Sequence, residues 1–279
     1  MDEHFRAFSF VDRITSVQDG KRIRGRFAIP SRLSEFPLSV VGEAVGQLAA
    51  WAAMAAVRFD QRPVAGLAGC IELIQAPRSG QVLELAADLE NVDSESVEYS
   101  GTAHADGRLV IRLHDCVGPM MRVVDFDDPE ALRRRFDELC QGVAGSRGSP
   151  ELPELTLQRA GGDPGQQVSA TFQVPASAPL FADHFPRRPV FPGSLLMHVN
   201  LQLGAMLASE LSLPPGSQWV AGTLRDMKLR SFIPPGTPLR LEARLKQRSP
   251  DSASLAFETR TSKELIATTS LLLKAEETA

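Results

Sequence analysis

Two long apolar stretches, one in each half of the chain, stand out from an otherwise mixed pattern of polar and apolar positions. Residues 38–57 carry no basic side chain and are apolar all round, which predicts a helix enclosed by other elements. Such a stretch is also long enough to cross a membrane. Glu43 and Gln47 near its start, with many alanines and glycines, favour a buried helix wrapped by a sheet instead. A second apolar helix is predicted to begin at Gly193.

Alternating apolar and polar residues follow each of these predicted helices. A period of two residues predicts antiparallel strands, and Asp106-Gly107 between two of them is a strong hairpin signal. Each half therefore consists of one long helix followed by several long strands. The alternating runs cover 82–89, 97–105 and 109–113 in the first half and 239–245, 255–259 and 265–273 in the second.

The two halves also resemble each other in sequence. Four residues of the first half recur in the second at a constant offset of about 155 positions, and Gly80 recurs as Gly236. A repeat of this length indicates two copies of one domain rather than a solenoid. We therefore assign 1–125 to a first domain, 126–155 to a linker with one helix and 156–279 to a second domain. The four matched pairs are Phe36 with Phe191, Pro37 with Pro192, Ser39 with Ser194 and Gln47 with Gln202.

The copies differ most in the segment before each helix. In the second copy, residues 183–192 carry His184 in a loop that three prolines stiffen. The matching stretch of the first copy is about ten residues shorter, so the segment with the histidine has no counterpart there. At one matched helix position the first copy carries Glu43 and the second carries His198.

The run from His184 to Gly193 resembles the His-Phe-Pro-x-x-Pro-x-x-Pro-Gly signature of the hot-dog-fold 3-hydroxyacyl-[acyl carrier protein] dehydratases. The resemblance implies an α+β fold, a double hot-dog in which an antiparallel sheet wraps each central helix. In that family two subunits share each active site, with the histidine from one and the acid from the helix of the other. This implies that Glu43 of the first copy faces His184 in one composite site, and that the mirror position with His198 is inactive.

The residue types at this site suit the removal of water from a 3-hydroxyacyl thioester. His184 can take a proton from the carbon next to the thioester at neutral pH. Glu43 lies among apolar helix residues, which suits a carboxyl that donates a proton to the departing hydroxyl. The backbone N–H groups of Gly193 and Ser194 at the helix start are expected to bind the thioester oxygen. Two further substrate-binding candidates are Phe191 and Gln47, the latter more readily explained as a hydrogen-bonding residue of helix packing.

Composition and charge restrict the partners. A formal charge of −4 over 279 residues gives no indication of nucleic-acid binding or of a polybasic membrane anchor. The three cysteines form no metal or redox spacing and suit a reducing cytosol, so we expect a cytoplasmic protein. The resemblance implies no metal or redox cofactor, since phosphopantetheine carries the substrate. Contacts to an acyl carrier protein, or to the phosphopantetheine of a carrier or of coenzyme A, are expected from Arg187, Arg188, Arg225 and Lys228.

The sequence therefore predicts dehydration of (3R)-hydroxyacyl thioesters to trans-2-enoyl thioesters in fatty-acid or polyketide biosynthesis. Two alternatives stay open: a non-catalytic acyl-binding or scaffold protein, and an acyl thioesterase that uses only the helix carboxylate. Isomerisation of the product double bond, the length of the acyl chain and a homodimer of the fused pair are also left open.

Overall fold

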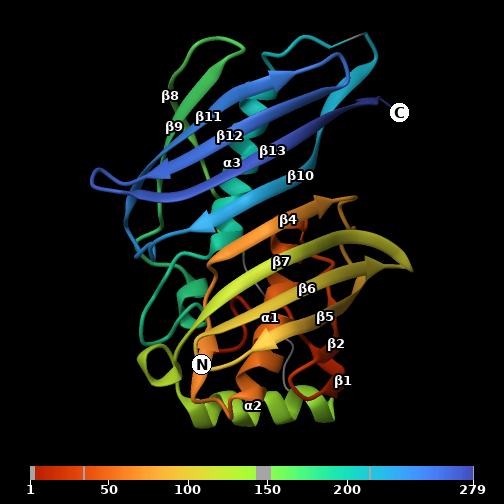
Figure 1. Cartoon of the computed structure of the whole chain (residues 1–279), viewed down its shortest axis with the longest axis vertical. Coiled ribbons are helices and arrows are strands. Elements are labelled where there is room, and N and C mark those ends of the chain that lie inside the picture. The colour runs from red at the N-terminus through yellow and green to blue at the C-terminus, as the bar shows by residue number, and fades with distance from the viewer. Residues whose placement is uncertain (1–3, 34, 143–151, 214, 279) are drawn as a thin grey trace.

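The computed structural model describes residues 4–33, 35–142, 152–213 and 215–278. A single 13-stranded antiparallel sheet curves around two central helices, with the first half of the chain at one end and the second half at the other (Figure 1). Along the sheet the strands follow the order β1-β2-β5-β6-β7-β4-β10-β13-β12-β11-β9-β8, and β3 pairs with β7.

Each half of the chain repeats the same order of elements, so the α+β double hot-dog fold predicted from the sequence is confirmed. We call β1 to β7 with α1 the first unit, and β8 to β13 with α3 the second unit. The first unit contains β1 (Arg13–Gln18), β2 (Arg22–Ala28), α1 (Leu38–Ala56), β3 (Gln61–Pro63), β4 (Leu67–Leu73), β5 (Val82–Val92), β6 (Ser96–Ala105) and β7 (Arg108–Arg122). The second contains β8 (Gln158–Gly161), β9 (Gln167–Gln173), the short helix η2 (Pro179–Ala182), α3 (Gly193–Ala208), β10 (Ser217–Leu229), β11 (Pro238–Arg248), β12 (Ser252–Arg260) and β13 (Leu265–Glu277).

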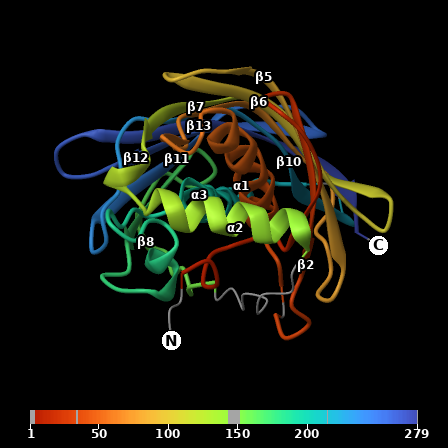
Figure 2. The same ribbon diagram turned by 90° about the horizontal axis from the view of Figure 1, so that it is seen from below.

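The two units join edge to edge through β4 and β10. These strands pair antiparallel over five residue pairs, from Glu72 with Thr223 to Leu67 with Lys228. Because this ladder makes one continuous sheet, α1 and α3 lie side by side under the same curved surface (Figure 2). The composite arrangement that two subunits would form is thus built within one chain.

The helix α1 is a core element. By length and composition it could cross a membrane, yet 61% of its most apolar window is buried inside the protein. Val40, Val41, Ala44 and Val45 are fully covered by the sheet and by α3. An antiparallel sheet that encloses a helix on several sides accounts for its apolar character all round.

Helix and sheet approach each other by different means in the two units. On β6, a Cβ added to Gly101 would lie 2.5 Å from Cγ1 of Val45 on α1. In the second unit the strand position that corresponds to Gly101 is occupied by Phe257, whose ring packs against Gly204 of α3. The small residue therefore stands on the strand in the first unit and on the helix in the second.

Between the units, η1 (Val123–Asp125) and α2 (Pro129–Gln141) follow β7. The Asp128 side chain caps α2 by accepting a hydrogen bond from the N–H of Glu130, and Gly142 ends it with a φ of 65°. The one helix predicted for the linker is therefore present as α2, and it packs against β1 of the first unit. Most of the glycine- and serine-rich segment after it, 143–151, lies outside the described residues.

Candidate active site

A cavity of about 220 Å³ lies between the two units and takes its lining from both. Glu43 and Gln47 come from α1, whereas His184, Gly193 and Ser194 come from the loop and helix start of the second unit. Much of the remaining lining is apolar and includes Phe8, Trp51, Met54, Ile71, Tyr99, Met197 and Met227. The structure thus brings these five predicted residues to one cavity.

His184 is partly buried in its loop, and one of its ring nitrogens already takes part in a hydrogen bond. Its Nδ1 lies 2.8 Å from the carbonyl oxygen of Val190, which can only accept, so Nδ1 carries the proton. The lone pair is then on Nε2, the atom that a general base needs free. Burial lowers the pKa of His184 below the ordinary histidine value, while the charge of Glu43 acts in the opposite direction. The ring is therefore neutral at neutral pH.

Gln47 links Glu43 to the N-terminal segment. Its Nε2 donates to Oε1 of Glu43 at 3.0 Å and to the carbonyl oxygen of Phe8 at 2.9 Å. Its Oε1 accepts from the N–H of Phe10 at 2.9 Å. Gln47 lines the cavity, but these contacts identify it as the residue that orients Glu43 and fastens the segment beside it.

The start of α3 faces the same cavity. The first N–H groups of a helix have no partner within that helix, and Gly193 and Ser194 occupy these positions. A Cβ on Gly193 would lie 2.5 Å from Cδ1 of Leu229 at the end of β10. Glycine there lets the helix start approach the strand closely, which leaves the N–H groups at the cavity wall.

Two serine hydroxyls add polar groups to the cavity. Ser39 and Ser194 occupy equivalent positions in the two copies, and both line the cavity. Neither hydroxyl has a hydrogen-bond partner in the part of the chain that the structure describes. Ser39 matches Ser194 in the sequence repeat, but only the packing of α1 beside α3 brings both into one cavity.

The sequence predicted Phe191 as a substrate-binding residue, but Phe191 is not among the residues that line the cavity. Its ring packs against Phe172 at a centroid distance of 5.6 Å and is buried in the core of the second unit. The motif position is apolar because it anchors the loop to β9, rather than because it binds substrate.

The four basic candidates lie away from the cavity lining. Arg187 donates to the carbonyl oxygen of Val124 at 3.0 Å, and the Arg188 guanidinium lies over the ring of Phe232. Both therefore hold the histidine loop against its neighbours. Arg225 and Lys228 are exposed on β10, where they directly follow the inward-facing Leu224 and Met227, so they lie on the outer face of the sheet.

His198 occupies the position in α3 that Glu43 occupies in α1. Its Nε2 lies 3.3 Å from Nε2 of Gln202, which repeats the pairing of Glu43 with Gln47. Burial lowers its pKa. Neither residue is among those that line the cavity.

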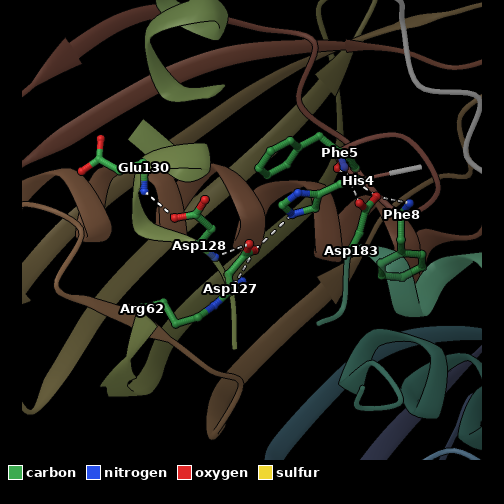
Figure 3. Close-up of polar contacts among 9 residues, drawn as sticks. His4, Phe5, Phe8, Arg62, Asp127, Asp128, Glu130 and Asp183 are labelled. Atoms are coloured by element: carbon green, nitrogen blue, oxygen red, sulfur yellow. Dashed lines mark hydrogen bonds and ion pairs between the residues drawn. The ribbon is translucent and has the colours of Figure 1, made fainter. Parts of the chain in front are cut away.

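Several charged residues at the cavity were missed by the sequence analysis (Figure 3). Asp183 accepts hydrogen bonds from the N–H of Phe8 at 2.7 Å, from the N–H of Phe5 and from Ser9 Oγ at 3.2 Å. These bonds fasten the N-terminal segment of the first unit to the histidine loop of the second. Asp183 directly precedes the motif that begins at His184, and this neighbouring position was a usable signal.

Arg62 and Asp127 form a second charged pair at the cavity. Nη1 of Arg62 lies 3.4 Å from Oδ2 of Asp127, and His4 lies 3.2 Å from the same oxygen (Figure 3). Arg62 comes from the three-residue strand β3 and Asp127 from the segment before α2, and no pattern in the sequence links them. In the described part of the chain, no group of three or more His, Cys, Asp or Glu residues is arranged to hold a metal ion.

The fold and the shared cavity define this class of protein as a fused pair of hot-dog units. Solved structures with this fold cover nearly the whole chain. They include a putative oleoyl thioesterase from Lactobacillus plantarum, with a TM-score of 0.59 at 10% identity over 92% of this chain and 97% of that one. Another is a hot-dog protein of unknown function from Alicyclobacillus acidocaldarius, with a TM-score of 0.53 at 12% identity over 98% of both chains. At these identities the likeness establishes the fold alone.

The family resemblance comes from the second unit. Residues 161–270 match the ApeI-like family, described as ApeI dehydratase. The 3-hydroxyacyl-[acyl-carrier-protein] dehydratase of Ligilactobacillus salivarius is 34% identical over 30% of this chain and 60% of its own length. That of Ruminiclostridium cellulolyticum is 32% identical over 30% of this chain and 58% of its own length. The chain thus spans about three fifths of the curated relatives it matches, and the match to the dehydratase family model falls on the second unit, which carries the histidine motif.

Proposed function

We propose that this protein dehydrates (3R)-hydroxyacyl thioesters to trans-2-enoyl thioesters at one composite site. The observation that carries the proposal is that Glu43 of the first unit and His184 of the second line the same cavity as the start of α3. One substrate can then contact a proton acceptor, a proton donor and the backbone N–H groups that would bind its oxyanion.

In the first step His184 acts on the substrate carbon next to the thioester. Its free Nε2 takes a proton from that carbon, while the hydrogen bond from Nδ1 to Val190 keeps the ring in the required tautomer. The electron pair moves toward the thioester oxygen, and the N–H groups of Gly193 and Ser194 donate to the developing negative charge. Removing one such donor typically costs about 3 kcal/mol of barrier.

In the second step the carbon–oxygen bond at the third carbon breaks. Glu43 gives its proton to the departing hydroxyl, which leaves as water, and the electron pair of the enolate forms the new double bond. Glu43 ends as a carboxylate and His184 as an imidazolium. Transfer of that proton from His184 to Glu43, directly or through the released water, restores both groups.

A substrate on phosphopantetheine fits this site, either on an acyl carrier protein or on coenzyme A. The curated relatives are named for substrates bound to the carrier protein. The unpaired Ser39 and Ser194 hydroxyls can bind the thioester or the amides behind it. We place the reaction in the cytoplasm, in fatty-acid or polyketide biosynthesis, with the basic residues around the histidine loop and β10 as carrier contacts.

Hydration of a 2-enoyl thioester, the reverse reaction, tests the proposal by loss of the enoyl absorbance. His184→Ala and Glu43→Gln should each lower kcat/KM by a factor on the order of a thousand. His198→Ala serves as the matched control because it changes a partly buried helix residue outside the cavity. If only the His184 variant loses activity, Glu43 is not the acid. Release of free hydroxy acid without enoyl product would identify a thioesterase instead, and absence of turnover on both carriers would favour an acyl-binding protein.

A further inference from the structure

Arg62 is a buried cation in the composite cavity. Its side chain is only 11% exposed, and its guanidinium carbon lies 3.8 Å from the centre of the Phe185 ring. Phe185 is the residue after His184, and the two rings stack at a centroid distance of 4.1 Å. Arg62 is therefore fixed against the motif that carries the general base.

The Arg62 guanidinium is only partly paired. Asp127 contacts one of its terminal nitrogens, and the Asp127 side chain is itself 3% exposed. Nε of Arg62 is buried and has no hydrogen-bond partner within the residues that the structure describes. Burial lowers the pKa of Arg62 to about 10, and the charges of Asp127 and Glu43 act in the opposite direction. Arg62 thus remains a cation at neutral pH, and its charge is only partly neutralised by the protein.

Three charged groups surround His184. Glu43 acts on it from α1 and Arg62 from β3, while Asp183 precedes it in its own loop. The N-terminal segment presents the uncharged ring of Phe8, edge-on at 6.0 Å. Asp183 is occupied by the amides of that segment, so Arg62 is the fixed charge that influences His184 from the other unit, and Glu43 adds an opposite charge when it is a carboxylate.

We propose that Arg62 is a positioning residue that holds His184 neutral before each turnover and stabilises the carboxylate that Glu43 becomes. The inference rests on the proposed function for its role in turnover. A fixed positive charge disfavours a second positive charge nearby, which keeps His184 ready to accept a proton. The same charge favours a negative charge nearby, which helps Glu43 to give up its proton. Its burial makes this influence stronger than that of a surface charge.

The test compares the wild-type protein with Arg62→Met, which removes the charge and keeps most of the volume, and Arg62→Lys, which keeps the charge. Arg133→Met is the matched control, because Arg133 also lies over a phenylalanine ring but on α2, outside the cavity. Two quantities are measured: the pH profile of kcat/KM for dehydration of a 3-hydroxyacyl thioester, in which His184 acts as the base, and the titration of the His184 ring by NMR, assigned with His184→Gln.

For Arg62→Met we expect the acid limb of the pH profile and the His184 titration to move together toward higher pH. We also expect kcat/KM at neutral pH to fall on the order of tenfold. Arg62→Lys should restore most of both properties, and Arg133→Met should match the wild type. If Arg62→Met fails to fold because Asp127 is left unpaired, the double variant Arg62→Met/Asp127→Asn removes both charges and answers the same question.

An unchanged titration of His184 in a folded Arg62→Met protein overturns the inference, even if activity falls at every pH. That outcome would mean that Arg62 only supports the fold. If the wild type hydrates no thioester while the titration moves as expected, the proposed function fails and the electrostatic control of His184 by Arg62 stands.

Discussion

Replacing Gly101 with alanine would add a methyl group where β6 meets α1. The new Cβ would lie 2.5 Å from Cγ1 of Val45 and 2.7 Å from the carbonyl oxygen of Ala86 on the neighbouring strand. Ordinary contacts begin at 3.4 Å, so the two overlaps are 3.4 − 2.5 = 0.9 Å and 3.4 − 2.7 = 0.7 Å. The second overlap is with main chain held in the sheet ladder, which a change of rotamer cannot relieve.

Relief requires α1 and β6 to separate, and overpacking of this kind costs about 1–3 kcal/mol. Because the main-chain overlap has no easy escape, we expect a loss near the upper limit, about 3 kcal/mol. In a chain of this size that lowers the melting temperature by roughly 6–12 °C. Val45 stands two residues after Glu43, so hydration activity should fall with stability.

Thermal and urea unfolding of the wild type and two glycine variants measure this effect. Gly222→Ala is the control, because its Cβ would meet mainly the flexible end of Lys274, at 3.3 Å. That variant should stay within about 0.5 kcal/mol of the wild type. A Gly101→Ala protein as stable and active as the wild type would refute the close approach of α1 to β6.

Three further predictions concern the site. The acid limb of the kcat/KM profile for dehydration should lie below the ordinary histidine pKa of about 6.5, because burial lowers the pKa of His184 and only its neutral form is a base in that direction. A limb above that value would contradict this. His198→Ala should leave kcat/KM within about twofold of the wild type, since the residue lies outside the cavity lining; a larger loss would indicate a role for the mirror position. Asp183→Asn should speed amide hydrogen exchange at Phe8, because the N–H of Phe8 loses a charged acceptor. This loss lowers the free energy of local opening by about 2 kcal/mol. Unchanged protection would mean that other contacts hold the segment.

The sequence was sufficient where function depends on local order. The histidine loop is contiguous, so its motif could be identified by its resemblance to a known family. The helix-then-strands order repeats within each copy, so periodicity and a constant offset predicted it. The pairing of Glu43 with His184 required the additional assumption that two copies share a site as two subunits do.

Arg62 escaped prediction because its partners are distant in sequence and its strand is short. β3 has three residues, which give no readable period. Asp127 and Phe185 reach Arg62 only after β7 and the histidine loop have packed against β3. Phe191 is the opposite case: it lies within the histidine motif, but its ring packs against Phe172 in the core of the second unit.

The ladder between β4 and β10 has a consequence for the precision of the site. Glu43 and His184, the proposed acid and base, belong to different units, and the main strand-to-strand junction between these units is a main-chain ladder of five residue pairs. A slip of one residue there would displace one unit by about 3.3 Å along the strand and turn the inward-facing side chains outward. The position of Glu43 relative to His184 therefore depends on the register of β4 against β10. If the proposed function holds, mutations that alter this register should lower activity although both residues are unchanged.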